Sequence, residues 1–497
     1  MFADLKSTIK NSNKYTLLLC FIYLLAHGGI LFIPNAIYWD DWVLYRNETR
    51  VILDTFRQAG SMFNFAGYLH VGLLEIGPWI YKWLTFILMF SSGLLLNTVI
   101  KRHGTINESI RFFIVLLFLI LPFNMARVTL IDFPYTLCYF LFFLAWALMD
   151  RFRLLALTLF FISFNTNSLL VFYAVPFFDM LNRSGYLKGW RSVIKFGLLN
   201  VDYLLLPFIY FFIKIYYFPP SGEYENYNEG YSIKNLIPAL ESQFNFSKYY
   251  LIYFYKKNFF LALAFSFFAF FLLRNYSISR SNHFSKVTVY GVGLGLIILL
   301  LGLFPYWILG YIPSFNEWTS RHQLLMPLGC SLIIVAVWSY LNRSIGFISV
   351  IVGFSLAFNI ATYKDFFFDW QKQQQLISIF AKTPQIKNGS LIIIDDKTKA
   401  MNAIDRSYRF YEWNGIFEAA FGDQKHFGIQ KEELSRYLSG EYKANVFTNS
   451  YKAASFNPDS LLPPVYVEIN LLEIGGLRER FRKSLYPKYS ITVTGAN

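Results

Sequence analysis

Long apolar runs separated by short polar turns fill the first 363 residues of the chain. About 20 consecutive apolar residues are enough to cross a bilayer as a helix. The pattern predicts eleven membrane segments, two of which are the short halves of one interrupted run. The runs cover residues 15–33, 71–100, 111–122, 133–149, 154–181, 196–218, 259–273, 287–309, 324–341 and 345–363.

The interruption falls at Asn165-Thr166-Asn167-Ser168, in the middle of the run 154–181. Polar, non-helical backbone at membrane depth is tolerated only against protein or water. We therefore expect two short helices, running up and down, which face a cavity.

Basic residues mark alternate turns between the apolar runs. Lys6, Lys10 and Lys14 precede the first run, and Lys101 and Arg102 follow the second. Short cytoplasmic loops carry such an excess of Lys and Arg. The pattern predicts a cytoplasmic N-terminus, an outside loop at 34–70 and, after eleven segments, an outside C-terminus. Within that loop, residues 43–62 are typical of an amphipathic helix lying on the membrane.

The character of the chain changes at residue 364, after which charged and polar residues dominate. Alternating patterns predict strands at 390–394, 464–470 and 489–494, and helices at 431–439 and 471–483. The predicted fold is an α-helical polytopic membrane protein over residues 1–363 with a C-terminal α/β soluble domain over residues 364–497. This domain is expected outside the membrane, where it assists acceptor binding or stability and carries no essential catalytic acid. Asp395 and Asp396 are interpreted as solvated loop acids.

Composition agrees with a membrane protein. Hydrophobic residues make up 55% of the 497 residues and charged residues only 15%, whereas soluble proteins carry roughly 25%. The net charge of +14 comes from Lys and Arg in short loops, without a basic stripe on a soluble segment, so no nucleic-acid partner is expected. The three cysteines lie in apolar runs, so no disulfide framework or metal spacing is indicated.

Two adjacent carboxylates, Asp40 and Asp41, follow the first apolar run and are flanked by Tyr38, Trp39 and Trp42. Like charges side by side repel unless a cation or a proton is shared, which favours a functional role. Two interpretations of the rings stay open. They are an ordinary aromatic belt at the membrane interface or a platform on which a sugar stacks.

Further polar residues lie on the same predicted outer face. They are His70, Glu75, Arg127, Asp132, Lys256, Lys257, Glu317, Arg321 and His322. A positioned Asp is a suitable general base, and Arg presents a planar fork for phosphate. We expect Asp40 or Asp41, Asp132 and Arg321 to line one cavity. The alternative is that each is an ordinary loop residue, with Arg321 reaching lipid headgroups.

The doublet Asp40-Asp41, the later acid Asp132 and the late segment Ser320-Arg321-His322 resemble the motifs of the GT-C superfamily of membrane glycosyltransferases. Many members carry Tyr where this chain has His322. The resemblance implies sugar transfer from a polyprenyl-phosphate donor to a lipid-linked or surface glycan acceptor, as in bacterial O-antigen modification. It places the protein in the bacterial cytoplasmic membrane, with the reaction on its outer face.

The resemblance also implies roles for individual residues. Asp41, Asp40 and Asp132 are the expected catalytic acids, with Asp41 favoured as general base and Asp132 assisting. The expected substrate-binding residues are Arg321, His322, Arg127, Lys256, Trp42 and Glu75. A divalent metal, Mg or Mn, is a possible cofactor, and Asp40 and Asp41 are its candidate ligands.

Two other functions stay open from the sequence. An O-antigen polymerase or ligase uses the same kind of lipid-linked substrate. A flippase or transporter is favoured by Asp202 within an apolar run and by the break at Asn165, but the chain has no repeated half.

Overall fold

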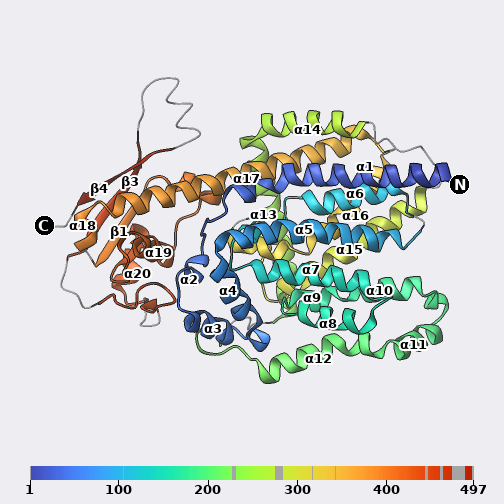
Figure 1. Ribbon diagram of the computed structural model, residues 1–497, viewed down its shortest axis with the longest axis horizontal. Coiled ribbons are helices and arrows are strands. Elements are labelled where there is room, and N and C mark those ends of the chain that lie inside the picture. The colour runs from blue at the N-terminus through green and yellow to red at the C-terminus, as the bar shows by residue number, and fades with distance from the viewer. Residues whose placement is uncertain are drawn as a thin grey trace.

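Most helices lie nearly parallel to the long axis of the molecule in the computed structural model, with the two termini at opposite ends (Figure 1). The structure describes residues 2–104, 106–225, 231–274, 284–315, 317–341, 343–388, 390–442, 446–458, 463–472 and 487–494. A bundle of apolar helices forms one part of the molecule. A small sheet with its own helices forms the other, at the C-terminal end (Figure 1).

The chain begins with a helix of 26 residues. The helices in chain order are α1 (Phe2–His27), α2 (Asp41–Leu44), α3 (Thr49–Gln58), α4 (Phe65–Ile76), α5 (Pro78–Lys101), α6 (Glu108–Ile120), α7 (Phe133–Leu148), α8 (Arg153–Ser163), α9 (Ser168–Phe172), α10 (Ala174–Arg183), α11 (Trp190–Leu199), α12 (Val201–Tyr217), α13 (Leu236–Lys257), α14 (Phe259–Leu273), α15 (Phe284–Trp307), α16 (Met326–Tyr340), α17 (Ile345–Phe380), α18 (Pro384–Asn388), α19 (Phe410–Phe421) and α20 (Leu434–Leu438). A hydrophobic core contributed by many of these helices holds the bundle together.

Four helices among the described residues are long and apolar enough to cross a membrane, and up to six if each of two bent pairs is one span. The four cover Lys14–Phe32, Pro78–Lys101, Tyr290–Trp307 and Ile345–Phe380. Several other predicted spans form shorter apolar helices, such as α7, α8 and α16. The sequence thus correctly predicts apolar spanning helices, and the count of eleven stays a prediction.

Two predicted spans are broken where the sequence suggests one helix. Residues 71–100 divide at Gly77, whose φ of 126° is incompatible with a helix and which Pro78 follows. Residues 196–218 divide at Asn200, and α11 and α12 meet at 66°. The amphipathic helix predicted at 43–62 is shorter, since α3 alone carries its regular turns. Apolar content hides such breaks because hydropathy does not register backbone angles.

The helix predicted at 345–363 continues for a further 17 residues. The sequence becomes polar at Lys364, yet Asp369, Lys372 and Gln373 are fully buried within α17. Asp369 and Lys372 have partners beyond the helix: Asp369 accepts a hydrogen bond from the Tyr408 hydroxyl, and the Asp396 carboxylate lies 2.6 Å from Lys372 Nζ. One helix therefore serves both parts of the molecule, and the predicted division at residues 363 and 364 stays a prediction.

A four-stranded sheet of order β2-β1-β3-β4 lies beyond the end of this helix. The strands are β1 (Leu391–Asp396), β2 (Phe427–Gln430), β3 (Val465–Leu471) and β4 (Tyr489–Thr494). The first three are parallel and β4 is antiparallel to β3, with Ile394 opposite both Gln430 and Val467. The sequence predicts β1, β3, β4 and the helix near 431–439, but not β2 or α19. Most of the helix predicted at 471–483 lies outside the described residues.

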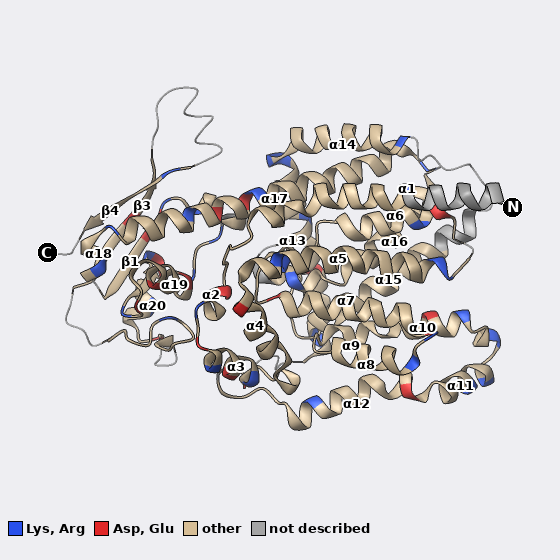
Figure 2. Ribbon diagram, in the orientation of Figure 1, with Lys and Arg blue, Asp and Glu red and all other residues tan. Residues whose placement is uncertain are grey.

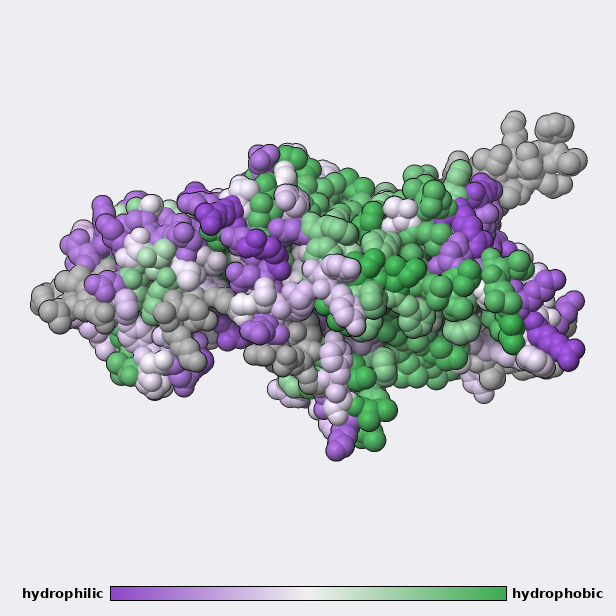
Figure 3. Space-filling model, turned by 90° about the horizontal axis from the view of Figure 1, so that it is seen from below, coloured by the Kyte–Doolittle hydropathy of each residue, from purple (hydrophilic) through white to green (hydrophobic). Residues whose placement is uncertain are grey.

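Exposed apolar side chains cover the bundle. On the face that Figure 3 shows, hydrophobic surface covers the middle of the bundle and hydrophilic surface lies at both of its ends. Phe208 of α12 and Phe260 of α14 are 65% and 82% exposed. Lys and Arg gather at the ends of the helices (Figure 2). So large an apolar surface is unfavourable in water and suits lipid. The chain is an α-helical membrane protein.

Candidate functional site

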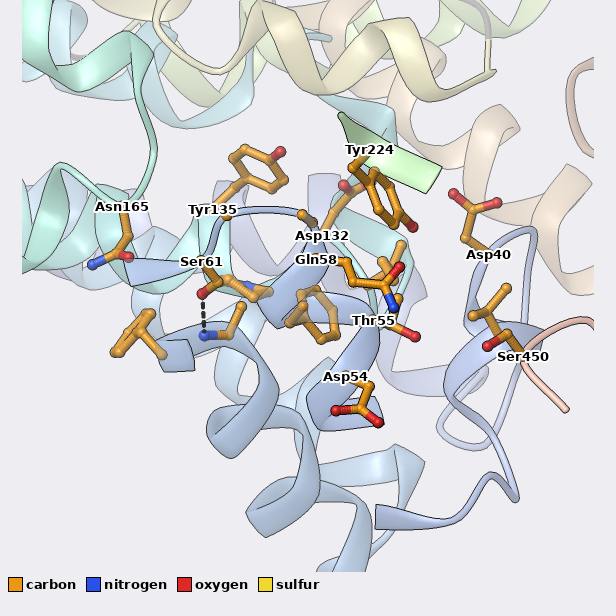
Figure 4. Close-up of a pocket in the computed structure, with 18 of the residues that line it drawn as sticks. Asp40, Asp54, Thr55, Gln58, Ser61, Asp132, Tyr135, Asn165, Tyr224 and Ser450 are labelled. Atoms are coloured by element: carbon orange, nitrogen blue, oxygen red, sulfur yellow. Dashed lines mark hydrogen bonds between the residues drawn. The ribbon is translucent and has the colours of Figure 1, made fainter. Parts of the chain in front are cut away.

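A cavity of about 650 Å³ lies where the bundle meets the C-terminal region. Its walls come from the loop before α2, from α3 and α4, from the start of α7, from the break after α8, from α12 and from the C-terminal region. Figure 4 shows Asp40 and Ser450 on one side and Asn165 on the other, with Asp132 and Tyr135 between them. Its polar and charged lining residues include Asp40, Asp54, Asp132, Tyr135, Asn165, Asn167, Lys214, Arg321, Tyr411 and Ser450.

Asp40 presents a carboxylate to this cavity. It follows Trp39, whose left-handed φ of 54° turns the chain sharply, and it precedes the first residue of α2. Burial raises the pKa of Asp40, while a hydrogen bond from the Tyr411 hydroxyl and the positive charge of Arg321 oppose this increase. A partly desolvated carboxylate with a raised pKa is a stronger base than an exposed one.

Asp41 has a different environment from Asp40. It is fully buried, and its carboxylate accepts backbone N–H bonds from Tyr38, Leu130 and Ile131 at 3.1, 2.7 and 2.9 Å. It does not line the cavity. Asp41 therefore ties the loop before α2 to the loop before α7, and the geometry favours Asp40 over the predicted Asp41 as a candidate base.

Asp132 and Arg321 form an ion pair in the wall of the cavity. Arg321 Nη1 lies 3.5 Å from Asp132 Oδ1, and Thr129 donates a hydrogen bond of 3.0 Å to Asp132 Oδ2. Burial raises the pKa of Asp132 to about 6, although the Arg321 charge acts in the opposite direction. The guanidinium also lies over the Tyr135 ring, 5.8 Å from its centre. Asp132 thus holds and orients the cation.

The polar break forms another wall, as expected from the sequence. Asn165, Thr166 and Asn167 line the cavity. The Asn167 side chain accepts a 2.7 Å hydrogen bond from the ammonium of Lys214, which α12 contributes. A second cation therefore lies in the cavity at a position that the sequence analysis did not single out.

The C-terminal region fixes the loop that carries Asp40. Trp39 N donates a 3.1 Å hydrogen bond to Glu412 Oε1, and Glu412 is paired with Arg406 at 2.6 Å. Trp42 packs so closely on α19 that a Cβ added to Gly415 would lie 2.3 Å from its ring. Asp40 is therefore held by partners from two parts of the chain.

Five predicted substrate-binding residues do not line the cavity. Arg127 is buried, and its guanidinium donates to the carbonyls of Phe123 and Asn124 in its own loop. The His322 ring stacks on Tyr306 with 4.4 Å between ring centres, and burial lowers its pKa to about 3. Trp42 is buried against α19, whereas Lys256 and Glu75 are exposed. These five residues therefore lie outside the lining of the cavity, and their binding roles stay predictions.

The two acids predicted to lie in a solvated loop of the C-terminal region, Asp395 and Asp396, have different environments. Asp395 is bonded to Lys397 and Lys431 near the surface. Asp396 is buried and paired with Lys372 of α17. The interpretation of Asp396 as a solvated loop residue is therefore wrong, because α17 extends far enough to cover it.

The residues present do not fit a resident divalent metal. Within the described part of the chain, no three His, Cys, Asp or Glu side chains form a group that could hold one. The candidate ligand Asp41 accepts three backbone N–H bonds, and the candidate ligand Asp40 accepts a hydrogen bond from Tyr411. The nearby Asp132 is paired with Arg321. The positive charge in the cavity comes from Arg321 and Lys214.

Tyr411, Lys214 and Tyr135 are among the cavity residues that the sequence did not reveal. Only Lys214 has a signal in the sequence, namely a charge close to the end of an apolar run.

Comparison with known proteins brings no match, since neither a family model, a curated protein nor a solved structure is significantly similar to the chain. The inference of function therefore depends on the geometry of the cavity.

Proposed function

We propose that the chain is a GT-C-type membrane glycosyltransferase that transfers a sugar from a polyprenyl-phosphate donor to a lipid-linked or surface glycan acceptor. The observation that carries this proposal is the cavity in which Asp40, Asp132 and Arg321 meet at the end of an apolar bundle. A lipid-linked donor needs a site of this kind, because its tail lies in the bilayer and its phosphate at the headgroup level.

The proposed reaction uses Asp40 as general base and Arg321 as the cation for the leaving phosphate. Asp40 accepts the proton of the acceptor hydroxyl, and the acceptor oxygen forms a bond to the anomeric carbon of the sugar. The bond between that carbon and the phosphate oxygen breaks, and the electron pair leaves with the polyprenyl phosphate. The Arg321 guanidinium stabilises the charge that develops there.

The proposal includes a topology. The N-terminus lies in the cytoplasm, eleven membrane segments follow, and the C-terminal region forms an α/β domain on the outer face of a bacterial cytoplasmic membrane. Support comes from the Lys and Arg residues around α10 and α11, at the end of the bundle opposite the C-terminal region (Figure 2). Arg102 and Arg183 both pair with Asp150 there, at 3.0 and 2.7 Å. Cytoplasmic loops are rich in such residues.

The test is a transfer assay with the purified protein in lipid nanodiscs, a radiolabelled polyprenyl-phosphate sugar and a lipid-linked glycan acceptor. Asp40→Asn keeps the size of the side chain and removes the base, so transfer is expected to fall by about 10²–10⁴-fold. Asp395→Asn, in the C-terminal sheet and outside the lining of the cavity, is the matched control and should keep wild-type turnover. Wild-type turnover by Asp40→Asn would remove Asp40 from the mechanism, and no transfer with any polyprenyl-phosphate sugar would contradict the proposed function.

A further inference from the structure

Lys214 lies in an apolar helix, but its ammonium faces the cavity. Its helix neighbours Phe211, Phe212 and Ile215 are 54%, 57% and 51% exposed on the apolar surface of the bundle. Lys214 itself lines the cavity, and its Nζ donates to Asn167 Oδ1 at 2.7 Å. The cation is therefore directed inward, toward the polar break, and away from the lipid-facing side of α12.

The neighbourhood of this ammonium lacks a compensating negative charge. No carboxylate among the described residues forms an ion pair with Lys214, and the three acids of the cavity have other partners. Asp132 is paired with Arg321, Asp54 with Arg57 at 2.8 Å, and Asp40 accepts a hydrogen bond from Tyr411. A charge in an apolar helix is costly unless it is paired, and such a residue marks a ligand or ion pathway.

We infer that Lys214 and the break at Asn165–Asn167 form a second anion-binding subsite for a phosphate of a lipid-linked substrate. This inference rests on the proposed function and specifies it further. Arg321 is held by Asp132 and Tyr135 at the start of α7, whereas Lys214 is held by the break that follows α8. The two cations thus belong to different walls of one cavity.

The subsite fits a phosphate for three reasons. Lys supplies a compact charge that binds phosphate oxygens, and the Asn167 amide, whose oxygen accepts from Lys214, carries an NH2 group that supplies further hydrogen-bond donors beside it. A cavity of about 650 Å³ is within the usual size range of small-molecule sites, roughly 300–1,000 Å³. The second phosphate belongs either to a polyprenyl-diphosphate acceptor or to the polyprenyl-phosphate donor.

The experiment measures binding of polyprenyl monophosphate and polyprenyl diphosphate to the full chain in phosphatidylcholine nanodiscs, without a transfer reaction. Lys214→Met removes the charge and keeps the stem, and we expect affinity for at least one probe to fall by about tenfold or more, as for the loss of a charged hydrogen bond. Lys214→Arg should retain most of the affinity. Lys248→Met, at an exposed position of α13, is the matched control and should bind both probes as the wild type does.

The two probes identify the source of the phosphate. A loss confined to the diphosphate assigns the subsite to the acceptor lipid, and a loss that includes the monophosphate assigns it to the donor lipid. Unchanged affinity of a well-folded Lys214→Met for both probes, with Arg321→Ala weakened, would overturn the inference and leave the proposed function standing. An equal loss of phosphatidylglycerol binding would also overturn it, since Lys214 would then bind lipid headgroups in general. No binding of either probe by the wild type would overturn both.

Discussion

Asp40 and Asp41 are neighbours in sequence, but their carboxylates have different environments and different roles. Asp40 faces the cavity with one hydroxyl donor, Tyr411. Asp41 accepts three backbone N–H bonds and joins two loops. Replacing Asp41 by Asn removes a charged acceptor, and hydrogen bonds to charged groups contribute about 1.5–3 kcal/mol each. We therefore expect Asp41→Asn to lower the melting temperature clearly, whereas Asp40→Asn should melt close to the wild type. Thermal unfolding in detergent compares the two, and the reverse order would contradict this assignment.

The pH dependence of transfer offers a test of Asp40 itself. Burial raises the pKa of Asp40, and the hydrogen bond from Tyr411 counteracts part of this increase. A base must be unprotonated, so activity should fall as the pH drops through this raised pKa, above the usual value of about 3.9. Tyr411→Phe removes the hydrogen bond and should move the acid limb of kcat/KM to higher pH.

Asp132 titrates in the same cavity, with a pKa raised to about 6. The acid limb of the kcat/KM profile therefore reports the protonation of both carboxyl groups. Tyr466→Phe, at an exposed position of β3, serves as the control and should leave the limb in place. An acid limb that Tyr411→Phe leaves unmoved would show that Tyr411 does not tune the base.

Arg321 is expected to require its planar group. The guanidinium pairs with Asp132 and covers the Tyr135 ring. The ammonium of Lys lacks the planar set of donors that can keep both contacts and bind phosphate at the same time. Arg321→Lys should therefore weaken polyprenyl monophosphate affinity. The same binding measurement on Lys248→Met gives the background for the loss of a surface charge. Equal affinity of Arg321→Lys and the wild type would favour a simple headgroup contact.

At the scale of elements, hydropathy predicts where apolar helices lie but not where they break or end. Gly77 and Asn200 interrupt predicted spans through their backbone angles, which composition does not record. The end of α17 was missed for another reason. Its polar residues are satisfied by side chains distant in sequence, as with Lys372 and Asp396. The break at Asn165 was predicted correctly because buried polar backbone has few permitted environments.

The pair of Lys372 and Asp396 provides a prediction at this scale. Both side chains are fully buried, and Lys372 also donates 2.6 Å to Asn402 Oδ1. Removing one partner of a buried pair leaves an uncompensated charge and costs about 3–5 kcal/mol. Lys372→Met or Asp396→Asn should each destabilise the protein strongly, and the double variant should lose less than the sum of the two. A thermal double-mutant cycle measures this coupling, and additive effects would exclude a direct interaction.

At the scale of the whole molecule, the sequence could predict that certain distant residues meet in one cavity, but it could not predict all the residues that line it. The sequence suggests that Asp40 or Asp41, Asp132 and Arg321 line one cavity, and Asp40, Asp132 and Arg321 do. It could not suggest Tyr411, because the packing of α19 against the loop before α2 depends on shape. The close fit of Trp42 on Gly415 has no signature in a single sequence.

The orientation of the molecule in the membrane can be tested with two introduced cysteines. Ser439 directly follows α20 in the C-terminal region, Lys188 lies in the turn between α10 and α11, and both are exposed. The helices α20 and α11 lie at opposite ends of the molecule (Figure 1). The basic turn that contains Lys188 should be cytoplasmic. In a background with the native cysteines replaced, Ser439→Cys should react with an impermeant thiol reagent on intact spheroplasts, and Lys188→Cys only after lysis. The opposite labelling would place the cavity on the cytoplasmic side, where nucleotide sugars are available, and would remove the reason for a polyprenyl-phosphate donor.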